Sequence, residues 1–285
     1  MGKTEKGGGD PSGSAVQTAI QKMQQDARNK KRAEVLANPQ LPLWPEAVRS
    51  LPNEIVRSAL FSAKNRKQKR EMLRQATIAV VGEGKITYTG DELRQDDETV
   101  WLQLIHHARE QKLGELIEFT PYSFCKAVHW PIKGQSYDRL REVLTRLQAT
   151  ALSVYSKRLG EGVSLSMIPF FAWKDDATGD SLPRWRVRVA PELVVLFGEN
   201  LYTKLEWEQR LALPDGLATW LHGYFASHKV PYPIKIETIR RGAGLSDSTK
   251  SDLKKTITRA LESLKNIGFL SAYKFVDDLV EVERV

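Results

Sequence analysis

The fold of this chain is indicated most clearly by residues 234–276, which run IKIETIRRGAGLSDSTKSDLKKTITRALESLKNIGFLSAYKFV. Residues 234–237 have the character of a short strand, and residues 237–243 are typical of a short helix. A turn over 244–248 follows, then a long helical pattern over 249–267 and a strand over 269–276. This order, a helix–turn–helix followed by a strand, is typical of the winged-helix domains that bind DNA.

The same order of elements occurs once earlier in the chain. A strand over 115–120 is followed by a short helix over 121–130, a turn with Pro131 and Gly134, a longer helix over 136–150, and strands from Ala151. The two longer helices share an apolar stripe, formed by Leu140, Val143, Leu144 and Leu147 in the first and by Leu253, Ile257, Leu261 and Leu264 in the second. The alternative is two unrelated amphipathic helices. We predict an α+β protein with tandem winged-helix domains.

Composition divides the chain into three parts. Residues 1–45 are predicted to be a flexible N-terminal tail, since most of this part has too few large apolar side chains to offset the entropy of ordering, although a helix is expected over 16–37. The first winged-helix domain is predicted over 46–189 and the second over 190–285. Within the first we expect helical structure over 46–75, broken by a basic run at 64–70, then a strand over 85–89 and a long helix over 91–112.

The helix over 248–265 is the strongest candidate for DNA contact. At about 100° per residue, the face opposite its apolar stripe carries cations and hydroxyls suited to phosphates and base edges. The predicted contact residues are Ser251, Lys254, Lys255, Thr258 and Arg259. The alternative is a solvated face that carries charge for solubility.

Three other groups are weaker candidates for DNA contact. On the first long helix Gln135, Arg139 and Arg146 are mixed with two acidic residues, which suits phosphate positioning or fewer base contacts. Residues 184–189 alternate strictly, so a strand there presents Arg184, Arg186 and Arg188 on one face; the alternative is an edge strand guarded by charge. Lys157 and Arg158 are placed at the tip of the first wing.

Composition also limits the class of protein. The chain has 285 residues and a formal net charge of +8, which favours a polyanionic partner, with nucleic acid ahead of a membrane surface. No apolar stretch approaches the roughly 20 residues that span a bilayer, and no signal peptide is visible. Cys125 is the only cysteine, which excludes an internal disulfide and a cysteine-based zinc site. We therefore expect a cytoplasmic protein.

No catalytic, metal or cofactor site is predicted. Gly84-Lys85 lacks the remaining residues of a phosphate-binding loop, and His106 and His107 are adjacent, so they diverge on a helix and cannot grip one metal. The pair Asp96-Asp97 is interpreted as solvated charge at a helix start rather than as a nuclease site. Tyr137 has no clustered base or metal, which argues against a covalent nucleophile.

The sequence resembles the iteron-binding replication initiators of broad-host-range plasmids. The resemblance covers essentially the whole chain, including MGKTEK at residues 1–6 and the stretch 135–159. It implies binding to repeats in double-stranded origin DNA, melting of adjacent AT-rich DNA with contact to the single strand, and recruitment of the host replication initiator and helicase. The family also implies self-association as a dimer.

A short peptide adds one further implied partner. Gln40, Leu41, Leu43 and Trp44 resemble the Gln-Leu-x-Leu-Phe peptide with which bacterial proteins dock into the replicative sliding clamp, with Trp in place of Phe. Prolines on both sides favour an extended docking segment. The alternative is simple packing of the peptide onto the first domain.

Two other functions remain open from the sequence. A transcriptional repressor would use the same two domains but would not melt DNA or need the clamp peptide. A DNA-nicking enzyme would cleave DNA with a metal ion or form a covalent tyrosine adduct.

Overall fold

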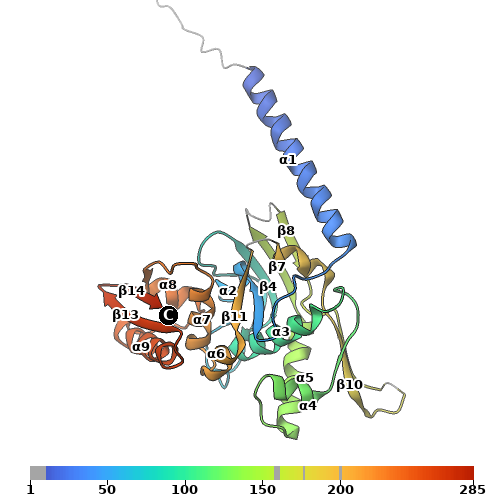
Figure 1. The fold of residues 1–285 in the computed structure, drawn as a ribbon, viewed down its shortest axis with the longest axis vertical. Helices are drawn as coiled ribbons and strands as arrows, with labels where there is room; N and C mark the ends of the chain where they lie inside the picture. Colours follow the sequence, from blue (N-terminus) through green and yellow to red (C-terminus); the bar gives the residue numbers. More distant parts are fainter. Residues whose placement is uncertain (1–10, 157–160, 176, 199–200) are drawn as a thin grey trace, which may run out of the picture.

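The computed structural model describes residues 11–156, 161–175, 177–198 and 201–285. In Figure 1 a body of mixed helices and strands carries a long helix, α1 (Pro11–Ala37), that projects away from it. Only the C-terminal end of α1 contacts the body, where Val35 and Leu36 pack against the core. The helix predicted over 16–37 therefore lies within α1.

The first unit is built on three small antiparallel sheets. β3 (Met72–Ile78), β4 (Lys85–Asp91), β7 (Ala151–Ser156) and β8 (Glu161–Leu165) form a four-stranded sheet in that order. β6 (Ile117–Phe119), β10 (Ser181–Arg188) and β9 (Phe170–Lys174) form a second sheet with β10 in the centre. β1 (Val48–Pro52) pairs with β11 (Tyr202–Glu206), and the short β2 (Phe61–Ser62) and β5 (Leu93–Arg94) pair in parallel.

Helices cover these sheets and complete the first core. They are α2 (Asn53–Val56), α3 (Gln95–Ala108), α4 (Pro121–Ala127), α5 (Gly134–Gln148), the 3-10 helix η1 (Pro191–Phe197) and α6 (Trp207–Ala212). The prediction of helix over 46–75 is wrong, because only Asn53–Val56 is helical there and the rest consists of strands β1, β2 and the start of β3 joined by turns and loops. Buried positions explain the error: β1 is buried on both faces, so it lacks the alternation that marks a half-exposed strand.

The second unit has the elements expected from residues 234–276. α7 (Leu217–Ala226) precedes β12 (Ile234–Lys235), α8 (Ile236–Gly242), α9 (Lys250–Asn266), β13 (Leu270–Val276) and β14 (Leu279–Arg284). The three strands pair in the order β12-β14-β13. The stripe residues Leu253, Ile257, Leu261 and Leu264 are buried with α7 in a core of their own.

The boundary between the two hydrophobic cores lies later in the chain than the predicted domain boundary. Residues 190–198 and 201–207 belong to the first core, since β11 pairs with β1 and η1 packs in this core, and the second core begins at about Leu213. The predicted boundary at 189/190 is therefore misplaced. The tail predicted to run to residue 45 also ends earlier, because Leu41 and Trp44 are buried in the first core.

The first helix–turn–helix differs from the second in its strands. Its stripe residues Leu140, Val143, Leu144 and Leu147 are fully buried as predicted. The hairpin β7–β8 that follows α5 joins β4 in the four-stranded sheet, while β6 pairs with β10 instead. The order of helices and strands therefore repeats along the chain, but the pairing of the strands does not.

Candidate nucleic-acid interface

Helix α9 presents its polar face to solvent. Its N-cap is Thr249, whose hydroxyl accepts a hydrogen bond from the backbone N–H of Asp252 at 3.2 Å, which satisfies one of the free amides of the first turn. The buried stripe fixes the rotation of the helix against α7. The predicted contact residues consequently lie together on the outer face, with Ser251, Lys254, Lys255 and Arg259 exposed and Thr258 half-buried.

The cations of α9 differ in the contacts that their side chains make within the protein. Lys254 Nζ lies 4.7 Å from the centre of the Phe275 ring on β13, and Lys255 is 3.7 Å from the exposed carboxylate of Asp252. Among the described residues no ion pair is recorded for Arg259. Exposed pairs of this kind contribute about 1 kcal/mol or less, so DNA phosphates compete easily for these side chains.

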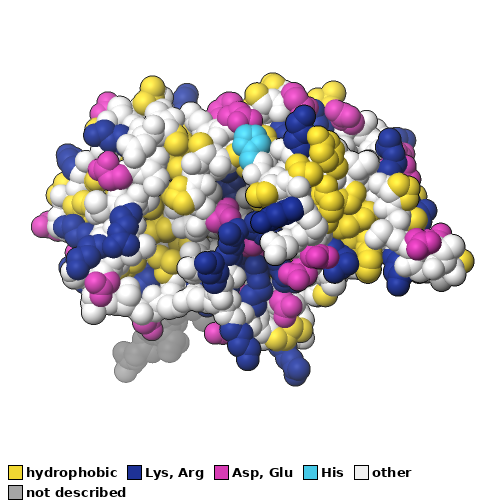
Figure 2. Space-filling model, turned by 90° about the horizontal axis from the view of Figure 1, so that it is seen from below, with side chains coloured by type: hydrophobic (Ala, Val, Ile, Leu, Met, Phe, Trp, Pro, Cys, Tyr) yellow, Lys and Arg dark blue, Asp and Glu magenta, His cyan; other side chains and the backbone are white. Residues whose placement is uncertain are grey.

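The hydroxyl of Thr258 donates to the carbonyl of Lys254 at 2.9 Å. Its oxygen can still accept a hydrogen bond, for example from the exocyclic amine of a base. Figure 2 shows dark blue side chains gathered at the left of this face, on the side of the C-terminal unit, and a second group across the middle.

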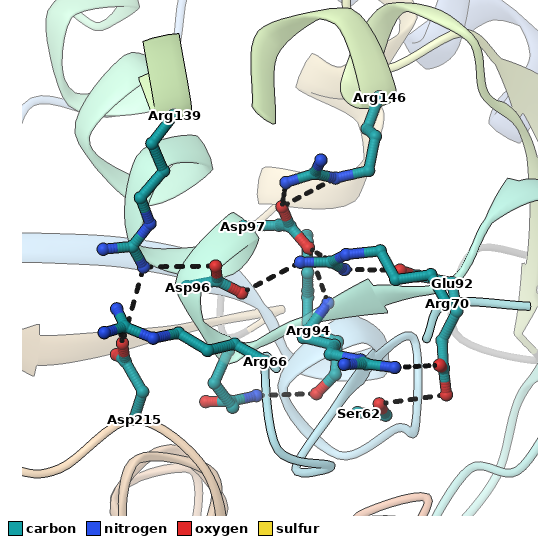
Figure 3. Close-up of polar contacts among 12 residues, drawn as sticks. Ser62, Arg66, Arg70, Glu92, Arg94, Asp96, Asp97, Arg139, Arg146 and Asp215 are labelled. Atoms are coloured by element: carbon teal, nitrogen blue, oxygen red, sulfur yellow. Dashed lines mark hydrogen bonds and ion pairs between the residues drawn. The ribbon is translucent and has the colours of Figure 1, made fainter. Parts of the chain in front are cut away.

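Two of the three predicted contact residues of α5 pair with groups inside the protein, unlike those of α9. Figure 3 shows Arg139 and Arg146 directed from α5 to the first turn of α3, where Asp96 and Asp97 lie. Arg139 Nη2 is 3.1 Å from Asp96 Oδ2, and Arg146 Nη2 is 2.8 Å from Asp97 Oδ1. Arg139 also lies over the Trp130 ring at 3.8 Å. Both arginines are thus engaged inside the protein, while Gln135 remains exposed.

Asp96 and Asp97 are buried rather than solvated, which corrects the sequence interpretation. Their side chains are 5% and 0% exposed. Burial alone would raise the pKa of the Asp96 carboxyl, but the guanidinium groups of Arg139 and Arg70 outweigh it and hold that pKa below its ordinary value. Asp97 accepts hydrogen bonds from Arg70, from Arg146 and from the backbone N–H of Arg94. The pair therefore anchors three arginines.

Strand β10 has the two faces predicted from its alternation. Trp185, Val187 and Val189 are buried, whereas Arg184 and Arg188 are exposed and Arg186 is half-buried. The edge-strand alternative is wrong, because β10 lies between β6 and β9. Its arginines form a positive surface on a central strand. The predicted wing residues Lys157 and Arg158 lie outside the described residues.

The clamp-like peptide is packed against α3. Leu41 and Trp44 are only 2% and 4% exposed, and Gln40 Nε2 donates to the carbonyl of Arg109 at 2.6 Å. Leu43 points outward and is 75% exposed. In this arrangement Gln40 is hydrogen-bonded and Leu41 and Trp44 are buried, so three of the four peptide side chains already contact the first unit.

His106 completes the packing of Trp44. The indole Nε1–H donates to His106 Nδ1 at 3.1 Å, so that nitrogen must be unprotonated. His106 Nε2 then carries the proton and donates to the Glu46 carboxylate at 2.9 Å. Burial, with nearby Arg49, lowers the pKa of His106 to about 4. His106 is thus a structural residue, and neutral at pH 7.

Neither a metal site nor a membrane span is found in the part of the chain that the structure describes. No three His, Cys, Asp or Glu side chains gather there as ligands of one ion. None of the helices there combines the length and apolar character needed to cross a bilayer.

The fold defines the class: a protein of mixed helices and strands with two helix–turn–helix arrangements, which resembles the solved structures of the Pi initiator and of RctB. The Pi initiator protein in complex with iteron DNA matches 82% of this chain and 92% of its own, with a TM-score of 0.52 and 11% identity. Domains 2 and 3 of RctB match 82% of this chain and 97% of theirs, with a TM-score of 0.51 and 10% identity. These TM-scores show a shared fold, and at identities this low they show the fold alone.

The family follows from the sequence match. The model of the TrfA protein family matches residues 6–284, and the chain belongs to this family. The plasmid replication initiator protein TrfA of Escherichia coli is 41% identical over 244 residues, which cover 85% of this chain and 63% of that relative. The chain thus spans less than two thirds of the relative's length.

Proposed function

We propose that this protein initiates plasmid replication by binding repeated sites in duplex origin DNA. The observation that carries the proposal is the outer face of α9, where Lys255 and Arg259 are exposed on a helix that follows a turn and precedes a hairpin. Membership in the TrfA family and the name of the Escherichia coli relative support this function. The Pi structure supports it further, since that initiator was solved on iteron DNA.

Both units act as winged helices in this proposal, with unequal roles. α9 enters the major groove, where Arg259 and Lys255 contact guanine edges or phosphates. β13 and β14 form the wing of the second unit, and β7 and β8 that of the first. Arg139 and Arg146 pair with buried aspartates, so they are not available to contact base edges. The first unit therefore positions the protein through contacts with phosphates.

Initiation in this account needs no catalysis. Binding to several repeats and bending the DNA supply the free energy that opens adjacent AT-rich DNA, whose single strand the protein then contacts. The protein acts in the cytoplasm, exchanges between dimer and monomer, and recruits the host replication initiator and helicase. No cofactor takes part.

Clamp docking requires a change of conformation. Leu41 and Trp44 cannot enter a clamp pocket while they are buried against α3. We therefore propose that the peptide leaves this position when it binds the clamp. Because Leu43 is exposed, Leu43→Ala tests docking without disturbing the first core; it should weaken capture on immobilised clamp and leave duplex binding unchanged. Full retention of clamp capture would contradict the assignment.

Footprinting on supercoiled origin DNA tests the function as a whole. We expect protection over evenly spaced direct repeats, together with permanganate reactivity of thymines in the adjacent AT-rich region. Protection without reactivity would indicate a repressor instead. Relaxation of the supercoiled DNA with a covalent protein adduct would indicate a nicking enzyme, and absence of protection would contradict the proposal.

A further inference from the structure

A basic loop lies between the two helix–turn–helix units. We define it as residues 64–70, KNRKQKR. It begins directly after a contact between the units: the Ala63 N–H donates to the carbonyl of Ala243 at 2.7 Å. Gly244 follows with a φ of +64°, and a Cβ there would lie 3.0 Å from the Cβ of Ser62. The start of the basic loop is therefore fixed against the turn between α8 and α9.

The other side of the basic loop faces α5. Three of its side chains line a hollow of about 430 Å³ together with residues from the turn before α5 and from α5 itself. The cations of this hollow are Arg66, Lys67, Arg70, Lys133, Arg139 and Arg146, and its carboxylates are Asp96 and Glu142. Asp97 and Asp215 pair with four of these arginines, but the hollow is still positive, because six cations face four carboxylates in all.

The backbone of the basic loop is held from inside the protein. The buried guanidinium of Arg94 donates to the carbonyls of Asn65, Gln68 and Lys69, the last two at 2.8 and 2.9 Å. The first residue, Lys64, pairs with Glu92 at 2.8 Å. At the other end Arg70 pairs with Asp97, as Figure 3 shows. A loop anchored at three places keeps its outward side chains in a defined position.

Three lysines on the basic loop and before α5 have no ion-pair partner among the described residues. Lys67 and Lys69 are exposed on the basic loop, and Lys133 is exposed just before α5. In the described ranges no ion pair is recorded for any of the three. Of the two carboxylates that line the hollow, Asp96 already pairs with Arg70 and Arg139.

We propose that Lys67, Lys69 and Lys133 bind phosphates of the duplex segment that lies between the two units. The proposal rests on the function proposed above, and adds a contact that neither recognition helix makes. Cations fixed on a folded surface contact the phosphate backbone without distinguishing bases. The basic loop thereby sets the spacing of α9 and α5 along one repeat, since it is tied to both units.

Salt dependence of binding tests this contact. Each phosphate contact contributes about 0.9 to the slope of log K against log salt concentration. We expect the double variant Lys67→Gln/Lys69→Gln to reduce the slope by about 1.8, on repeat duplex and on random duplex alike. Between 50 and 200 mM salt the wild-type protein should then lose about twelvefold more affinity than the variant. Lys133→Gln should reduce the slope by about 0.9.

The matched control is Lys22→Gln/Lys31→Gln on α1, where both lysines are exposed but lie on the projecting helix. This variant should keep the wild-type slope, and thermal unfolding should be unchanged for all variants. An unchanged slope in both the double variant and Lys133→Gln would overturn the proposal. If wild-type protein showed no preference for repeat duplex, the proposed origin recognition would fail, while the slope on random duplex would still report on the basic loop.

Discussion

Helices α5 and α9 bury the same kind of apolar stripe but use their polar faces in opposite ways. Arg139 and Arg146 on α5 turn inward to buried aspartates of α3, whereas Lys255 and Arg259 on α9 remain in solvent. The difference arises from a partner element, since α3 supplies Asp96 and Asp97 to α5. Similar amphipathic patterns therefore give one helix whose arginines pair inside the protein and one helix whose cations stay exposed, and we propose the second as the main recognition helix.

The largest expected effect comes from removing an anchor of α5. Asp97→Ala leaves Arg146 without its buried anion and leaves Arg70 with Asp96 alone, so the free energy of unfolding should fall by roughly 3 kcal/mol in urea denaturation. Asp252→Ala is the matched control in the first turn of α9, where the carboxylate is exposed. It should cost less than about 1 kcal/mol. Equal losses would show that the aspartates of α3 do not set α5 apart.

Lowering the pH should reduce the stability of both units. Burial lowers the pKa of His106 to about 4 in the first unit and that of His222 to about 3 in the second. Unfolded histidines titrate near 6.5, so the unfolded state binds more protons between that pH and the folded pKa. Stability is therefore full above pH 6.5 and falls as the pH decreases through this window, by at most about 3 kcal/mol for His106.

The contribution of the first unit can be separated with His106→Gln. This variant should reduce the pH dependence of the free energy of unfolding between pH 6.5 and 4 by the share of His106 and keep the share of the other buried histidines, whose pKa values are also lowered by burial. A pH dependence equal to that of the wild-type protein would contradict the neutral, buried state of His106.

Removing a cation from each helix should give opposite results. Arg259→Ala should weaken binding to repeat duplex by about 1–3 kcal/mol, with little effect on random duplex if the side chain contacts a base. Arg146→Ala should lower the free energy of unfolding and preserve the ratio of the two affinities. Fluorescence anisotropy with both duplexes measures this ratio. If Arg146→Ala reduced the preference for repeat duplex more than Arg259→Ala, the roles assigned to the two helices would be contradicted.

The smallest effect is expected from β10. Arg184→Gln and Arg186→Gln on its positive face should each reduce the salt slope by about 0.9 if they contact phosphate, and leave the preference for repeat duplex intact. Lys126→Gln on α4 is a control of equal charge. A change in preference would mean that β10 contacts bases.

Local patterns predicted the elements that depend on local spacing. The stripes from Leu140 to Leu147 and from Leu253 to Leu264 follow helical periodicity, and all of the predicted stripe residues are buried. The alternation of Arg184 to Val189 likewise gave both faces of β10 correctly. In each case the side-chain period alone decides which face is buried.

Distant partners explain what the sequence did not predict. Asp97 lies 49 residues from Arg146, and Trp44 lies 62 residues from His106, so neither pair leaves a local signal. The sequence therefore did not show that Arg139 and Arg146 on α5 pair with α3, while Lys255 and Arg259 on α9 stay exposed. In the clamp-like peptide the prolines indicated an extended segment, but the sequence did not show that Trp44 is buried against His106.

The most direct test of the comparison uses the single cysteine. Burial raises the pKa of the Cys125 thiol to about 11, so an introduced thiol reacts selectively with an iron chelate. With Lys255→Cys on α9 we predict cleavage focused within each repeat, at major-groove positions. Val16→Cys on α1, which projects away from the body in Figure 1, should give no focused cleavage. Absence of cleavage within the repeats from position 255, in protein that still protects them, would contradict α9 as the recognition helix.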